Sequence, residues 1–176
     1  AFFVMGLALL FAGRRGSQLR FALAVLPLAV FGLLHAAHEW YEMFQHVVML
    51  ANGGLPPSLP AELMRLGLLV GSFVALLVFA MLLLTDRSTP RWRLWGPVGA
   101  ILLLWLLGVM LVAVRFQLPP AEVLAAADNL ARYSIGIPAA LLGAWALMAQ
   151  QRIFREHDMS QFGRDLVWAA AALLLY

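Results

Sequence analysis

The chain has 176 residues, of which 64% are hydrophobic and 12% are charged. Soluble domains carry roughly twice that share of charged residues, so this composition leaves too little polar surface for a water-soluble fold and indicates a membrane protein. All twelve basic residues are arginines spread among short connections, which argues against a nucleic-acid-binding patch, and the absence of Cys excludes disulfides, thiolate metal sites and a cysteine nucleophile.

Six apolar segments follow one another along the chain, separated by stretches rich in Arg, Pro, Gly and Asp. They cover residues 1–12, 21–48, 63–84, 94–114, 130–150 and 166–176. Continuous runs of roughly 20 apolar residues match the thickness of a bilayer core and favour helices over the alternating strands of a barrel. The pattern predicts an all-α polytopic transmembrane helix bundle, with four complete and two truncated spans, that forms one membrane-embedded domain over residues 1–176.

We expect both ends of the chain to be truncations. The chain begins at Ala1 within an apolar segment, and the last apolar segment is too short to cross a bilayer. The full protein would then have seven spans, and the seventh would bring the chain into the cytoplasm, where an output module could be attached.

The arginines alternate between the two sides of the predicted bundle. Nine of the twelve lie in or beside every second connection: Arg14, Arg15, Arg20, Arg87, Arg91, Arg93, Arg152, Arg155 and Arg164. By the positive-inside rule these connections face the cytoplasm, so the N-terminus of the chain is expected outside, in the bacterial cytoplasmic (inner) membrane. The two outer connections are short and rich in proline, so recognition from outside would fall to the helices.

The second apolar segment carries an unusual stripe of ionisable residues. At 3.6 residues per turn, one narrow face of this helix holds His35, Glu39, Glu42 and His46, with His38 at its edge. A charge facing lipid costs at least roughly 2.5 kcal/mol, so the stripe is expected to turn inward and to line a pocket. Because His46 lies close to the outer surface, the pocket should open outward.

The stripe also offers metal-ligand spacing. The pairs His35 with Glu39 and Glu42 with His46 are four residues apart, which lets two side chains reach one ion. We consider His35, His38 and His46 as candidate ligands of a metal or a haem, against the alternative that they make ordinary interhelical hydrogen bonds. The sequence lacks zincin and nucleotide-binding motifs, so no catalytic residue is predicted, and His157, in a cytoplasmic connection, is expected to be only solvated.

The fifth apolar segment supplies the expected opposite wall of the pocket. Its outer end carries four polar residues: Asp128, Asn129, Arg132 and Tyr133. Arg132 is the predicted counter-charge of Glu39 or Glu42, either within a ligand site or as a structural ion pair. Pro138 lacks an N–H group and should leave the carbonyl of Ser134 without its helical partner. In the third segment, Gly67 and Gly71 form a G-x-x-x-G pattern, for which packing within the chain is favoured over a dimer seam.

Two segments resemble the N-terminal multi-helix membrane region of bacterial sensor histidine kinases, many of which carry PAS domains. Phe31-Gly-Leu-Leu-His35-Ala-Ala-His38-Glu39-Trp40 is similar to a stretch F-G-L-L-H-G-x-x-E-W of that region. Residues 131–142, with the pattern A-R-Y-x-x-G-x-P-x-x-L-L, are similar to a second stretch. This chain departs from the pattern at Ala36, where a glycine is expected. The resemblance implies a sensory input module whose kinase, ATP site and phosphorylated histidine lie beyond this segment.

Three functions remain open at the level of the sequence. The first is a sensory module that detects an unknown signal through the His/Glu/Arg pocket and biases a cytoplasmic histidine kinase, with homodimerisation through cytoplasmic parts. The second is a membrane redox protein that binds a haem or a metal. The third is a small transporter, for which no inverted repeat is visible between the halves. In all three, the lipid bilayer is the partner and nucleic acid is not.

Overall fold

The computed structural model describes residues 1–14, 20–85, 90–156 and 167–173, and every regular element in these ranges is a helix. The helices are α1 (Phe2–Arg14), α2 (Arg20–Ala51), α3 (Leu59–Leu84), α4 (Arg91–Phe116), α5 (Pro120–Ala131), the π-helix η1 (Arg132–Gly136) and α6 (Ile137–Glu156), followed by a helical segment over 167–173. The predicted all-α fold is therefore confirmed. The connection with His157 lies outside the described residues.

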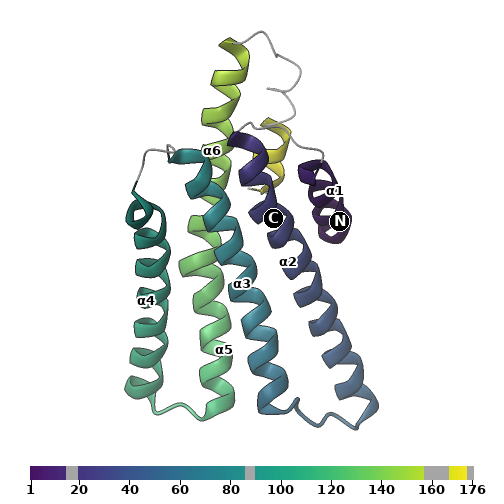
Figure 1. Ribbon diagram of the computed structural model, residues 1–176. Coiled ribbons are helices and arrows are strands. Elements are labelled where there is room, and N and C mark those ends of the chain that lie inside the picture. The colour runs from purple at the N-terminus through teal and green to yellow at the C-terminus, as the bar shows by residue number, and fades with distance from the viewer. Residues whose placement is uncertain (15–19, 86–89, 157–166, 174–176) are drawn as a thin grey trace.

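The long helices stand side by side and run alternately in opposite directions (Figure 1). At one end of the bundle, α1 ends at Arg14, α2 begins at Arg20 and α4 begins at Arg91, and we call this the arginine end. At the other end, the proline end, the turns from α2 to α3 and from α4 to α5 contain Pro56, Pro57 and Pro119, and α5 begins at Pro120. This up-and-down arrangement matches the alternation of the arginines along the sequence.

Three helices are long and apolar enough to cross a membrane: Leu59–Leu84, Trp92–Phe116 and the continuous rod Pro120–Gln151 formed by α5, η1 and α6. Within the described residues, α1 contributes only a shorter apolar helix, Phe2–Phe11. The prediction of four complete spans is thus supported for three of them. α2 is not among these three helices, and a seven-span protein is not supported by the described residues.

The hydrophobic core is centred on α3, which packs against α2 on one side and α6 on the other. Its fully or nearly fully buried side chains include Leu69, Phe73, Leu76, Leu77 and Phe79. By contrast, α4 packs along one edge of the bundle, and the indole N–H of Trp105 donates a hydrogen bond to the Ala127 carbonyl at 3.0 Å. Most large apolar side chains of α4 are exposed, as expected for a helix that faces lipid.

Small residues allow one close helix contact, but not where the sequence pattern placed it. A Cβ on Gly32 of α2 would lie 2.9 Å from the Phe2 carbonyl oxygen of α1, so the two backbones meet there. Gly67 has no atom within 4 Å of its would-be Cβ, and Gly71 meets only Leu34, at 3.6 Å. The G-x-x-x-G pair in α3 therefore makes no tight contact among the described residues, because Gly67 faces outward.

Candidate functional site

Two buried histidines of α2 are anchored to α3 through the same ring nitrogen. His35 Nδ1 lies 3.1 Å from Ser72 Oγ, and the Ser72 hydroxyl donates to the Leu69 carbonyl at 2.7 Å. The hydroxyl proton is thereby used, so His35 Nδ1–H is the donor to Ser72. His38 Nδ1 lies 3.1 Å from the Arg65 carbonyl, which can only accept, so His38 also donates from Nδ1. Both neutral rings then carry their lone pair on Nε2.

The Nε2 atoms of both rings approach carboxylates on their own helix. His35 Nε2 lies 3.4 Å from Glu39 Oε1, and His38 Nε2 lies 3.5 Å from Glu42 Oε2. His38 Nε2 is buried without a hydrogen-bond partner among the described residues. A proton taken up on either Nε2 would face a carboxylate, so the stripe predicted from the sequence forms two His–Glu couples along α2.

A metal centre is not assembled by these side chains. An Nδ1–H that is held by a neighbouring oxygen is the usual orientation of a metal-ligating imidazole, and both buried rings have it. Nevertheless, the described part of the chain contains no group of three or more His, Asp or Glu side chains that could hold an ion. His46, the third predicted ligand, is exposed and borders a separate small cavity near the proline end with Glu42, Glu62 and Arg65.

Arg65 of α3 is the centre of an ion-pair network that ties three helices together. Its guanidinium contacts Asp128 of α5, lies 3.0 Å from Glu62 of α3, and lies 3.5 Å from Glu42 of α2. The side chains of Arg65 and Asp128 are only 13% and 9% exposed. Such a charge is tolerated at this depth because its partners surround it.

Arg132 does not make the direct ion pair predicted for it. Its Nε donates to Asp128 Oδ1 at 2.7 Å, one turn back along the same rod, while Glu42 is paired with Arg65. The prediction was wrong in its partners because Arg65 enters between α2 and α5 and takes the carboxylate assigned to Arg132. Tyr133, also a predicted pocket residue, is 70% exposed.

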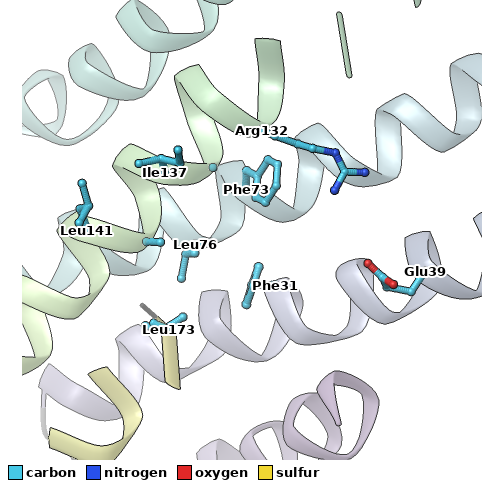
Figure 2. A pocket seen from close by; sticks show the side chains of 10 residues that line it. Phe31, Glu39, Phe73, Leu76, Arg132, Ile137, Leu141 and Leu173 are labelled. Atoms are coloured by element: carbon cyan, nitrogen blue, oxygen red, sulfur yellow. The ribbon is translucent and has the colours of Figure 1, made fainter. Parts of the chain in front are cut away.

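A cavity of about 500 Å³ nevertheless lies between α2 and the rod, where the sequence predicted a pocket. Its polar lining consists of Glu39 and Arg132, and its apolar lining comes from Phe31, Phe73, Leu76, Gly136, Ile137, Ala140, Leu141 and Leu173. Figure 2 shows Glu39 and Arg132 at one end of this cavity, on opposite walls, with the apolar side chains toward the other end. His35 lies beside the cavity, with its ring centre 5.4 Å from that of Phe31 and 6.0 Å from that of Phe73.

The π-helix η1 shapes the wall that carries Arg132. Pro138 cannot donate to Ser134, and the helix widens here, so that the Ile137 N–H bonds to the Arg132 carbonyl five residues back. The Ser134 hydroxyl donates to the Leu130 carbonyl at 2.6 Å. The irregular backbone predicted from Pro138 is therefore present, and it begins at the residue that brings a positive charge to the cavity.

Sequence reasoning missed two side chains that organise this site, Arg65 and Ser72. Arg65 is one of the three arginines outside the nine of the positive connections and was given no role in the site, although an arginine within an apolar span indicates a buried partner. Ser72, fully buried opposite His35, gave no signal beyond being a hydroxyl in an apolar run.

Comparison of the chain with models of known protein families, with curated proteins and with solved structures found no match. The functional interpretation therefore rests on the geometry above, and the resemblance to sensor kinases stays a prediction.

Proposed function

We propose that this chain is a membrane-embedded sensory input domain of a bacterial signal-transduction protein, of the kind attached to sensor histidine kinases. The observation that carries the proposal is that the two stretches with the family resemblance, far apart in sequence, line one cavity. Phe31 and Glu39 come from the first stretch, and Arg132 and Gly136 come from the second. A shared cavity gives these two stretches a common physical role, which is to enclose a ligand.

The lining defines the chemistry of that ligand. The apolar walls favour a hydrophobic body that reaches the cavity from the bilayer, while Arg132 favours a negative or accepting group and Glu39 a donating one. An amphiphile that carries both groups at one end fits this pattern. Arg132 uses Nε for Asp128, so its terminal nitrogens are the donors that would meet the ligand.

Signal transmission requires two packings of the bundle with different affinity for the ligand. We place the moving contact between α2 and the rod, at η1, because a π-turn can interconvert with a regular α-turn by losing one residue from the bulge. In this proposal α2 is the fourth complete span and the N-terminus is outside. The arginine end then lies on the cytoplasmic side, and α6 transmits the change in packing at η1 to that end. Reporter fusions between α3 and α4 should then read cytoplasmic.

The test is a chimera of this chain with a soluble histidine kinase core, read out by phosphorylation of its response regulator. Ala140→Phe, which fills the cavity from α6, should keep the phosphorylation of the response regulator at one constant level under all conditions. Ala100→Phe, an exposed position on α4, is the matched control and should leave the output as in the parent chimera. If Ala140→Phe is expressed in the membrane and behaves like the parent, the cavity is not the sensory site.

Haem binding is the second candidate, because it needs only one or two imidazoles rather than a cluster. It is favoured by the buried Nε2 of His38, which has no hydrogen-bond partner among the described residues. A Soret band in the purified protein that disappears in His38→Ala would support it. A colourless protein after expression with added haem would remove it.

A further inference from the structure

Another hollow lies on the α4 side of the rod, away from the cavity that contains Glu39. It is a groove of about 650 Å³ between α3, α4 and α6, next to the arginine end. Apolar side chains such as Leu84 and Leu142 line it, and Trp92, Trp145 and Arg93 border it. Nothing in the proposed sensory mechanism uses this groove.

The border of the groove has the composition of a membrane interface. The indoles of Trp92 and Trp145 are 68% and 62% exposed, and tryptophan rings collect where the acyl chains meet the headgroups. The apolar span of α4 begins at Trp92, so Arg93 stands within the first turn of the span. Its guanidinium lies 5.4 Å from the centre of the Trp92 ring, which keeps the charge at this level.

The arginine residues at the arginine end favour an anion. Arg14, Arg20 and Arg91 are terminal residues of helices at this same end. The opposite end carries the carboxylates in the first turns of α3 and α5, Glu62 and Glu122. A negatively charged headgroup is therefore attracted to the arginine end and repelled from the proline end.

We propose that this groove binds an anionic phospholipid. Its phosphate accepts hydrogen bonds from Arg93, and one acyl chain lies in the groove along α4 and α6. A free phosphate or a soluble headgroup does not satisfy the site, because most of the lining is apolar and gains nothing from a small anion. A zwitterionic lipid would also fill the groove, but the positive group of its headgroup would offset the attraction between its phosphate and Arg93.

The contribution of the Arg93 charge to lipid binding is tested by native mass spectrometry of the purified chain with phosphatidylglycerol, phosphatidylcholine and glycerol 3-phosphate. Phosphatidylglycerol should bind more tightly than phosphatidylcholine, and glycerol 3-phosphate should not compete with it. Arg93→Gln should weaken phosphatidylglycerol binding about fivefold, since one arginine near an anionic surface contributes about 1 kcal/mol. Arg115→Gln is the matched control, because Arg115 lies over the Phe116 ring at the other end of the same helix. An equal loss in both variants, or competition by glycerol 3-phosphate, would overturn the proposal.

The groove itself is tested with two glycines of α4. Gly96 lines the groove and Gly99 does not, and neither has an atom within 4 Å of its would-be Cβ, so both accept a larger side chain. Gly96→Leu should reduce phosphatidylglycerol binding severalfold while leaving Arg93 in place. Gly99→Leu should bind as the parent does. Unchanged binding in Gly96→Leu would show that the lipid lies elsewhere.

Discussion

Helices α3 and α4 are both 26 residues long, and their most apolar stretches have nearly the same mean hydropathy, yet they occupy opposite environments. In its most apolar stretch, 44% of α3 is buried inside the protein, against 6% of α4. What separates them is a few polar groups: α3 carries Arg65 and Ser72, which pair with α2 and α5, whereas α4 has no charge between Arg93 and Arg115. The apolar content of a helix favours its insertion into the bilayer, and a few polar contacts with neighbouring helices determine its position within the bundle.

The largest effect is expected from removing the charge at the centre of α3. Arg65→Met should lower the free energy of unfolding by about 3 kcal/mol, because buried Asp128 would keep only Arg132 as a counter-charge and the partly buried Glu62 would lose its cation. Denaturant unfolding of the detergent-solubilised protein measures this loss. Arg115→Met on α4 is the control and should cost less than about 1 kcal/mol.

The double variant Arg65→Met with Asp128→Leu should be more stable than Arg65→Met alone, since it also removes the buried carboxylate that lost Arg65, while the Arg132 side chain is 40% exposed. Additive losses in this cycle would mean that the two groups do not depend on one another. In that case polar contacts would not explain why α3 is buried and α4 is exposed.

Apolar truncation should separate the two helices next. Leu69→Ala in α3 removes a fully buried side chain and should cost about 2 kcal/mol, since the bundle cannot fill the space left behind. Leu107→Ala in α4, where the side chain is 52% exposed, should change stability by less than about 0.5 kcal/mol. Equal losses would indicate that α4 is buried by a partner.

A smaller effect is expected at the glycine that meets α3. A Cβ on Gly136 would lie 2.9 Å from the tip of the Phe73 ring, so Gly136→Ala should cost about 1 kcal/mol while the ring shifts. Phe73→Leu should restore most of that loss. On α4, a Cβ on Gly108 would lie 3.8 Å from Leu130, so Gly108→Ala should be neutral or slightly stabilising in the same denaturant unfolding experiment.

The smallest effect is expected from the neutral hydrogen bond between α2 and α3. Ser72→Ala removes the acceptor of His35 and should cost about 0.6 kcal/mol, the average for hydrogen bonds in membrane proteins. The Nδ1 chemical shift of His35 should change in the same variant, which a purely steric effect would not produce. An unchanged shift would contradict the assigned tautomer.

The fold was largely predictable because each helix corresponds to its own run of apolar residues in the sequence. Proline and arginine mark its ends, so the order and direction of the elements followed from local composition. The fourth predicted span, at α2, is not among the helices found long and apolar enough to cross a membrane, and it stays a prediction. Which helix would be central was not predictable, because α3 and α4 differ by only a few polar side chains.

The site was predictable in part, for a related reason. Helical periodicity placed Glu39 on an inward face, and Pro138 indicated the irregular wall that carries Arg132. The ion pairs were not predictable, because the choice among three carboxylates depends on how far each helix is shifted along its neighbours. Arg65 reaches Asp128 across 63 positions of sequence, and no local pattern encodes that distance.

The five residues of η1 also set the angular phase of the rod. One residue more per turn than an α-helix rotates everything after it by about 100° relative to everything before it. Asp128 before the bulge and Ala146 after it are 18 residues apart, which is five whole turns of a regular α-helix, so the bulge turns their faces about 100° from one another, and both are buried. Deleting a single residue such as Ser134 would keep the length and apolar character of the span almost unchanged. It would also rotate the buried alanines of α6 away from α3. At this point the rotational register of the helix therefore matters more than its composition.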